Sequence, residues 1–471
     1  MDDSLRLYIK NVQVNKAAID SRLTHPFSAM RYPARLVFVQ LKRYAGTFLE
    51  SGSTLRCVGI TGFRGLGKTT LLWQTANYVW QHFRQPIYFF NVTALRSMNV
   101  SLHEALDALQ EWVLERRFNQ IDTPFTILLD EVQEDPDWCK TLKNLFDEAR
   151  TALIICTGSQ ELEAGRSADL ANRMRIEKIY PFRFSEFVAA KTYIDDRANM
   201  LYPAAGLSTQ LKECLFFSDT ADTAFASLAA LTPRIQAYYA EIETGRKLNI
   251  NDLVQRYVSY QNIPNFLFYK EKYTITDSLL GLFTRMLRED IERWSVGPET
   301  LQQIERLILH LATTDEVNIS KLADIVGIAP ERTEDIIDRL ASSELLYVLP
   351  PHSKGSGLPK AFFTSPSIRR ALLAPLYGHK IPDNFRFMMM EDVIVMYLQR
   401  LLMGSILSAA SENTSAFVVE TRDVPLLLEV GLASVKAVQK FRYHIQVSNQ
   451  ITEPSFENGC IRLPLRWFLL L

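Results

Sequence analysis

The chain has 471 residues, enough for roughly two to four domains of ordinary size, so a single small module is excluded. Its composition, with 47% apolar and 22% charged residues, 19 glycines and 20 prolines, excludes a collagen-like or low-complexity protein. The 52 basic and 53 acidic side chains almost cancel. Any surface that binds nucleic acid or an anionic membrane must therefore be local.

The cysteines and the apolar segments predict a cytoplasmic protein. Five cysteines stand far apart without a C-x-x-C pair, which favours neither a disulfide framework nor a zinc site. The first residues lack the basic and then apolar order of a signal peptide. No stretch of about 18 residues is free of charge, and the nearest candidate, residues 385–410, contains Arg386 and Asp392. We expect a buried helix there, and no membrane span.

Short β-branched or aromatic runs alternate with helical stretches after an N-terminal helical segment (residues 1–50). Near-continuous apolar strands of this kind are buried on both faces. We therefore predict an α/β core with a parallel sheet and helices on both of its faces over residues 51–185. The five predicted strands are residues 55–61, 86–92, 125–131, 151–158 and 175–181.

The rest of the chain divides into three further segments. Residues 186–298 are predicted to be mostly helical. Residues 299–365 contain three helix-length segments followed by two strands, which is the order of a winged helix-turn-helix. Residues 366–471 contain a long predicted helix, 389–402, and then strand-like pieces, which predicts a small α/β domain.

A glycine-rich sequence stands between the first predicted strand and a helix predicted over residues 69–82. It satisfies G-x-x-x-x-G-K-[ST], in which glycines let backbone N–H groups turn inward around phosphates and the helix N-terminus adds positive charge. A turn that matches by chance is disfavoured, because motif, strand and helix coincide. We expect Lys68 to neutralise phosphate charge and Thr69 to ligate Mg2+. The predicted nucleotide-binding residues here are Gly62, Phe63, Arg64, Gly65, Leu66, Gly67, Lys68, Thr69 and Thr70.

Two carboxyl residues end the third predicted strand. An acid at the end of a neighbouring strand holds Mg2+ in phosphate-loop enzymes, and an adjacent Glu can polarise the attacking water. We therefore assign Asp130 to the metal and Glu131 to the catalytic base. The alternative for Asp130 is an acid that caps a helix N-terminus.

Two further positions are weaker candidates. Thr157 and Ser159 follow the fourth strand, where their hydroxyls could sense the terminal phosphate, although a simple turn explains them equally well. Arg173 and Arg175 stand just before the last strand. We favour Arg173 as a finger that reaches the nucleotide of a neighbouring subunit; the alternative is a solvated surface arginine.

These residues together resemble the AAA+-type ATPases of the archaeal-ATPase and STAND-related branch, over about residues 30–450. In that group a winged helix and a restriction-endonuclease-like domain follow the ATPase module, so the resemblance implies a helical lid in residues 186–298 and an endonuclease-like domain in residues 366–471. It implies ATP rather than GTP, since no N-K-x-D stands at the expected place. Where the family usually has Ala-Gly-Arg, this chain has Ala171-Asn172-Arg173. The segments that carry the resemblance are GFRGLGKTTLL, LLDEVQEDPDWCKTLKNLFDEAR, IICTGS and LANRMRIEKIYPFRFSEF.

The predicted winged helix is too acidic for ordinary DNA binding. Residues 301–350 contain nine acids and four bases, and the candidate recognition helix, residues 331–340, has four acids against two arginines. Because neutralisation of phosphates supplies most DNA affinity, we expect this segment to contact protein or to act as a hinge.

The endonuclease-like segment lacks most of a metal site. Active members of that fold use two strand acids and a lysine two residues after the second acid. Glu429 matches the second acid, but Gly431 stands at the lysine position and Ala416 at the first acid. We therefore expect a degenerate domain, in which Glu391 is a solvated helix acid and Glu429 a strand-end acid.

The favoured function is an ATP- and Mg2+-dependent conformational switch that hydrolyses ATP and works through a protein partner or as a homo-oligomer. The alternatives are a non-hydrolysing, nucleotide-bound scaffold and a DNA-associated protein with an inactive nuclease domain. An ATP-gated nuclease is a third hypothesis. Nucleic acid is disfavoured as a partner by the acidic winged helix.

Overall fold

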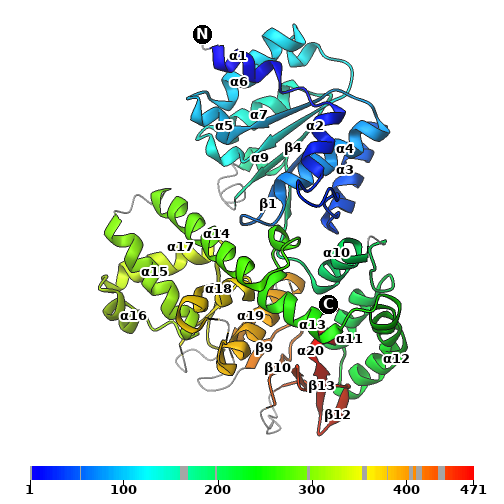
Figure 1. The fold of residues 1–471 in the computed structure, drawn as a ribbon, viewed down its shortest axis with the longest axis vertical. Coiled ribbons are helices and arrows are strands. Elements are labelled where there is room, and N and C mark those ends of the chain that lie inside the picture. The colour runs from blue at the N-terminus through cyan, green and yellow to red at the C-terminus, as the bar shows by residue number, and fades with distance from the viewer. Residues whose placement is uncertain are drawn as a thin grey trace. The chain divides into compact units, whose positions relative to one another are not determined.

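The computed structural model describes residues 3–471 apart from 53–54, 160–167, 197–198, 294–297, 353–357, 379, 403–406, 410–415 and 433–440 (Figure 1). The chain divides into two units, Met1–Tyr180 and Pro181–Leu471. Across the described residues, no helix has the length and apolar character that a membrane crossing requires.

A sheet of five parallel strands forms the centre of the first unit, in the order β2-β3-β4-β1-β5. All five strands lie where the apolar runs predict them. Strands β1, β3 and β4 are buried along their whole length, as expected of strands covered on both faces. The strands are β1 (Cys57–Thr61), β2 (Ile87–Asn91), β3 (Phe125–Asp130), β4 (Ala152–Gly158) and β5 (Arg175–Lys178).

Helices cover both faces of this sheet, which confirms the predicted α/β class (Figure 1). Helices α3 and α4 pack on one face against β4, whereas α1, α6 and α7 bury their apolar sides in a core with the other face. Helix α4 begins at Lys68, one residue before its predicted start. The helices are α1 (Asp3–Lys10), α2 (Lys16–Leu23), α3 (Val37–Ser51), α4 (Lys68–His82), α5 (Val92–Ser97), α6 (Leu102–Leu109), α7 (Trp138–Glu148) and α9 (Ala168–Ala171).

The order of the strands positions the functional site. Strand β4 lies between β1 and β3, so the carboxyl ends of these three strands meet at one edge of the sheet. The phosphate-loop sequence follows β1, Thr157 lies at the end of β4, and Asp130 ends β3. Ligands of open α/β sheets bind at this edge.

The second unit begins with helices and contains a two-stranded antiparallel sheet, β6-β7. Three helices, α15 to α17, precede that sheet, in the order that the sequence predicts for residues 299–365. The helices are α10 (Phe184–Asp196), α11 (Leu207–Phe217), α12 (Ala221–Ala240), α13 (Ile250–Arg256), α14 (Lys272–Arg293), α15 (Pro298–Thr313), α16 (Ile319–Val326), α17 (Pro330–Ser342), α18 (Pro366–Tyr377), α19 (Asp383–Leu401) and α20 (Leu465–Phe468).

A mixed six-stranded sheet, in the order β12-β13-β11-β10-β9-β8, forms the C-terminal part of the second unit. Helix α19 is buried as predicted, but it begins earlier than residue 389, and residues 407–409 of the apolar stretch form strand β8 rather than helix. The strands of this unit are β6 (Leu346–Leu349), β7 (Lys360–Phe363), β8 (Leu407–Ala409), β9 (Ala416–Val419), β10 (Leu426–Val430), β11 (His444–Ser448), β12 (Ser455–Glu457) and β13 (Cys460–Pro464).

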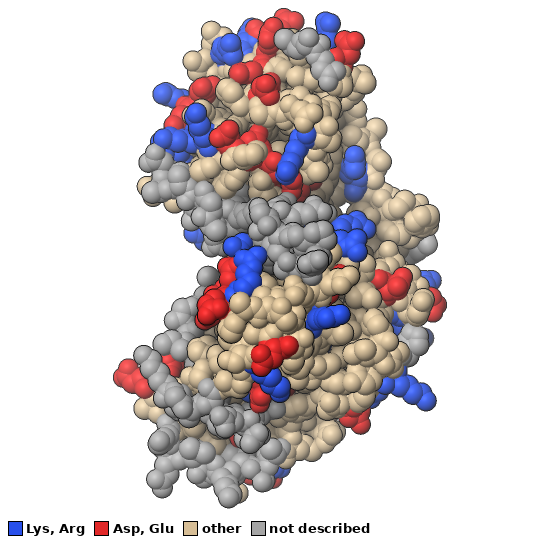
Figure 2. Space-filling model, turned by 90° about the vertical axis from the view of Figure 1, so that its left-hand side faces the viewer, with Lys and Arg blue, Asp and Glu red and all other residues tan. Residues whose placement is uncertain are grey.

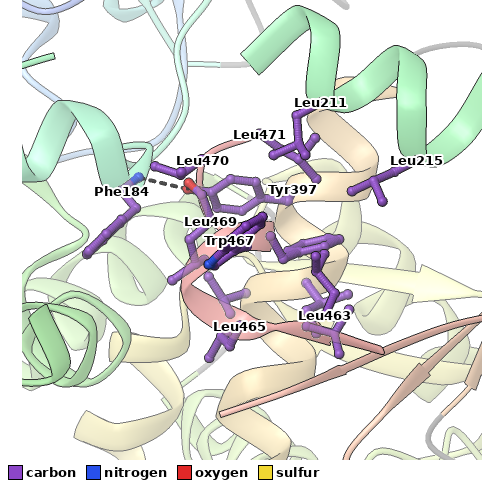
Figure 3. Packing of buried hydrophobic residues seen from close by; sticks show 14 of the residues in the cluster. Phe184, Leu211, Leu215, Tyr397, Leu463, Leu465, Trp467, Leu469, Leu470 and Leu471 are labelled. Carbon is purple, nitrogen blue, oxygen red and sulfur yellow. Dashed lines mark hydrogen bonds between the residues drawn. The ribbon is translucent and has the colours of Figure 1, made fainter. Parts of the chain in front are cut away.

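One apolar core joins the helices that follow residue 181 to one face of this C-terminal sheet. Figure 3 shows Trp467 and the leucines around it packed with Leu211 and Leu215 of α11 and with Tyr397 of α19. The backbone N–H of Phe184 donates to the Tyr397 hydroxyl at 2.7 Å, so the beginning of α10 is tied to α19. Residues 186–298 and 366–471, which the sequence separates, therefore share a core.

Candidate functional site

The loop between β1 and α4 has the backbone that only glycine adopts without strain. Gly62, Gly65 and Gly67 have φ values of 145°, 84° and 89°. A Cβ atom on Gly62 would lie 2.6 Å from the carbonyl oxygen of Ile179, so the loop packs directly against the backbone that follows β5. The glycine spacing therefore serves both conformation and close approach, as a phosphate-binding loop requires.

Lys68 lies at the start of α4 with its side chain 4% exposed. Its Nζ atom donates to the carbonyl oxygen of Gly62 at 2.8 Å and lies 3.7 Å from Oε1 of Glu131. The ammonium group is thus held inside the loop, beside the carboxylate of Glu131, the residue that follows β3. This is a position from which it can neutralise a phosphate bound by the loop.

Asp130 is the most buried acid of the site. Its Oδ1 accepts a hydrogen bond from the Thr157 hydroxyl at 2.6 Å, and the Thr69 hydroxyl lies 3.0 and 2.9 Å from Oδ1 and Oδ2. Burial raises the pKa of Asp130, and the hydrogen bond from Thr157 opposes that rise. Mg2+ prefers oxygen ligands of this kind, so the hydroxyl of Thr69 and the carboxylate of Asp130 fit a magnesium site.

Glu131 is fixed by its backbone as well as by its side chain. Its φ of 56° is left-handed, a conformation that costs a non-glycine residue about 1–3 kcal/mol. The backbone N–H donates to the hydroxyl of Thr157 at 3.0 Å, and Oε2 accepts from Nε2 of Gln133 at 2.7 Å. Strain that surrounding contacts hold in place is characteristic of functional positions.

The structure therefore brings Lys68 close to Glu131 and Thr69 close to Asp130, while the catalytic and metal-binding roles of the four residues stay predictions. Ser159 follows the end of β4, and its hydroxyl is buried without a hydrogen-bond partner in the described part of the chain. The remaining predicted loop residues, Phe63, Arg64, Leu66 and Thr70, lie between β1 and the first turn of α4.

The two candidate finger arginines have acidic neighbours within the first unit. Nε of Arg173 lies 3.1 Å from Oδ1 of Asp147 near the end of α7. Arg175 is more exposed and lies 3.4 Å from Glu177 within β5.

Arg35 contacts the loop and was not predicted. It is buried, and its guanidinium donates to the carbonyl oxygens of Leu66 at 3.1 Å and Tyr180 at 2.9 Å. It thereby ties the phosphate loop to the last residue of the first unit. No local pattern around an isolated arginine marks such a role, because both acceptors are backbone atoms distant in sequence.

The C-terminal acids differ in part from their prediction. Glu391 is buried on α19, so the expectation of a solvated helix acid is wrong. Glu429 stands opposite Ala416 in the β9–β10 register, and burial raises its pKa. A Cβ atom on Gly431 would lie 2.8 Å from the Phe387 ring. Within the described ranges, no group of three or more His, Cys, Asp or Glu residues could hold a metal ion.

Surface charge is mixed on the face that Figure 2 draws. Among the described residues of that face, acidic and basic side chains are interspersed, without one continuous basic patch. On the candidate recognition helix, α17, Asp335 pairs with Arg332 and Arg339 at 2.7 and 3.0 Å. Both arginines of that helix segment are thus engaged by the same acid.

Comparisons with known proteins agree with the geometry of the first unit. A family model described as an AAA domain matches residues 55–188. An uncharacterized protein of Methanocaldococcus jannaschii is 26% identical over 480 residues, which cover 98% of this chain and 94% of that protein. The strand order, the glycine loop and the carboxyl pair define a P-loop nucleotide-binding domain. With the family match, they support an AAA-type ATPase domain.

Solved structures are more distant. The RuvB Holliday junction branch migration motor of Thermotoga maritima is 15% identical, with a TM-score of 0.29, over 67% of this chain and 90% of that one. PCH-2 of C. elegans is 13% identical, with a TM-score of 0.29, over 70% of this chain and 74% of that one. Superpositions this loose carry no weight beside the family match and the site.

Proposed function

We propose that the protein binds ATP with Mg2+ at the carboxyl edge of the first sheet and hydrolyses it. The observation that carries this proposal is the convergence of Lys68 and Thr69, at the start of α4, with Asp130 and Glu131, at the end of β3. Each has the chemistry that one part of phosphoryl transfer needs: a cation, a hydroxyl, a metal-binding carboxylate and a base.

In this proposal, different groups of the protein bind the phosphates, hold the metal and activate the attacking water. The loop N–H groups and Lys68 hold and neutralise the phosphates, while Thr69 and Asp130 hold the metal. The magnesium ion, when bound, stabilises the charge that develops on the phosphate oxygens. Glu131 accepts a proton from the attacking water, a contribution typically of 10²- to 10⁴-fold to the rate. Ser159, whose buried hydroxyl meets no hydrogen-bond partner among the described residues, is the proposed sensor of the terminal phosphate.

The proposed biological role is a conformational switch. The loop contacts Ile179 through Gly62 and Tyr180 through Arg35, and the second unit begins at the next residue, Pro181. In this proposal, a shift of the phosphate loop when the phosphates change moves Ile179 and Tyr180, where the chain leaves the first unit. In this proposal residues 186–298 form the lid, 299–365 a winged helix and 366–471 a degenerate endonuclease-like domain.

We propose that the conformational change acts on a protein partner or on a second copy of this chain. On α17 the acids Glu331, Glu334 and Asp338 are exposed, which disfavours phosphate backbones and favours protein contact. Arg173 is the proposed finger in a self-assembled form, released from Asp147 on assembly.

Phosphate release tests hydrolysis directly. In the Glu131→Gln variant we expect ATP affinity within about threefold of the wild type and turnover lower by 10²- to 10⁴-fold, because the amide cannot accept the proton. Glu148→Gln on α7, an exposed acid of the same unit, is the matched control and should retain turnover. ATP binding by wild type with no phosphate release above the Glu131→Gln background, partner present, would favour a non-hydrolysing scaffold.

A gated nuclease is the remaining candidate. The feature that motivates it is Glu429, which is partly buried and whose Oε2 has no hydrogen-bond partner in the part of the chain that the structure describes. Mg2+-dependent DNA cleavage that Glu429→Ala abolishes would support it. Intact DNA under every nucleotide condition removes it.

A further inference from the structure

A glutamine contacts the proposed catalytic base. Gln133 lies in the short helical turn Val132–Glu134, and its Nε2 donates to Oε2 of Glu131 at 2.7 Å. The other polar atom of the amide, Oε1, is buried and has no hydrogen-bond partner among the described residues. An unpaired buried acceptor costs about 1–3 kcal/mol, so among the described residues the hydrogen bond to Glu131 is the favourable polar contact of this side chain.

The chemistry of an amide suits this place better than a charged side chain would. The carboxylate dictates the orientation of Gln133, because only the NH2 group can face it without repulsion between oxygens. A lysine or arginine at this position would pair with Glu131 and weaken it as a base. A neutral donor orients the carboxylate and leaves its charge intact.

Two further contacts of Glu131 show what Gln133 adds. Thr157 fixes the backbone N–H of Glu131 but not its carboxylate. Lys68 lies 3.7 Å from Oε1, and a bound phosphate competes with Glu131 for that ammonium group. The bond from Gln133 to Oε2 involves neither Lys68 nor the Thr69 and Asp130 side chains, so a phosphate that engages Lys68 would leave this bond in place.

We propose that Gln133 is a positioning residue that aims the Glu131 carboxylate at the attacking water. This inference rests on the proposed function, in which Glu131 is the base for ATP hydrolysis. Gln133 itself touches neither nucleotide nor water in this role; it acts through Glu131.

The first test separates turnover from binding. Gln133→Met keeps the length of the side chain and removes the donor, whereas Gln133→Glu replaces the donor with an acceptor. We expect both variants to bind ATP within about threefold of the wild type and to turn over about 10- to 100-fold more slowly, since misplacing a reacting group costs this much. Gln81→Met, on the exposed side of α4, is the matched control and should match the wild type.

The second test asks whether Gln133 acts through Glu131. In the Glu131→Gln background, Gln133→Met should lower turnover by no more than about twofold, because residues that act as a unit are not additive. A multiplicative loss in the double variant overturns the inference, as does a loss of ATP affinity that accounts for the whole effect in the single variant.

The outcomes for the inference and for hydrolysis are distinct. Wild-type turnover that Gln133→Met leaves unchanged overturns the role of Gln133 alone. ATP binding by the wild type without turnover overturns hydrolysis, and the role of Gln133 with it.

Discussion

Both units bury a carboxylate, but they surround it with different partners. Asp130 in the first unit and Asp392 in the second are buried, and burial raises the pKa of each. Asp130 is held by the hydroxyls of Thr157 and Thr69, which are neutral. Asp392 is held by the guanidinium of Arg369. Neutral donors leave the negative charge of a carboxylate available to a metal cation, whereas an arginine neutralises that charge in an ion pair.

The Arg369–Asp392 ion pair finds its hydrogen-bond partners within the second unit. Nε and Nη2 of Arg369 donate to the two carboxylate oxygens at 2.6 and 2.8 Å, and both side chains are 0% exposed. Nη1 donates to the carbonyl oxygens of Leu311 and Ala312 in α15, and the N–H of Phe363 donates to Asp392. The pair thus joins α15, β7, α18 and α19, and we interpret it as structural.

Breaking this pair is the largest expected effect. Arg369→Met leaves Asp392 buried and unpaired, so the free energy of unfolding of the second unit should fall by about 3–5 kcal/mol. ATP affinity should be unchanged at a temperature where the variant is folded. Urea titration, with hydrogen exchange of α19 amides, measures the loss.

A surface pair in the same region supplies the control. Arg386 lies 3.3 Å from Asp383 on α19, and both side chains are exposed, so Arg386→Met should cost no more than about 1 kcal/mol. Equal losses in the two variants would contradict the structural interpretation of the buried pair.

In the phosphate loop, we expect a substitution that disturbs the backbone conformation to lower stability, rather than one that breaks an ion pair. Gly62→Ala places a methyl group 2.6 Å from the Ile179 carbonyl oxygen at a φ of 145°, so we expect the first unit to lose about 3 kcal/mol and to bind ATP more weakly. Hydrogen exchange of β1 amides reports the loss.

Gly52→Ala distinguishes conformation from contact. Gly52 has a φ of 68°, but a Cβ atom there meets nothing within 4 Å, so the cost should be about 1 kcal/mol, without an effect on ATP binding. A Gly62→Ala variant no worse than Gly52→Ala would show that the close approach to Ile179 is unimportant.

The sequence predicts the first unit better than the second because its signals are local. Apolar runs and a contiguous glycine motif locate the five strands and the loop without knowledge of the packing. The pair of Arg369 and Asp392 depends on tertiary packing between residues 23 positions apart, as the burial of Glu391 does. Strands β12 and β13 and the buried residues 465 and 467–471 carry no motif, and only the apolar core of the second unit reveals their place.

Binding of ATP tests the central claim most directly, because the claim assigns nucleotide to the first unit through Lys68. Titration of ATP with Mg2+ into wild type, Lys68→Ala and Lys140→Ala, an exposed lysine on α7, gives three affinities under identical conditions. We expect Lys140→Ala to match the wild type and Lys68→Ala to bind at least about 100-fold more weakly, since a buried cation is lost from the phosphates. Unchanged ATP affinity in a folded Lys68→Ala variant would contradict the account.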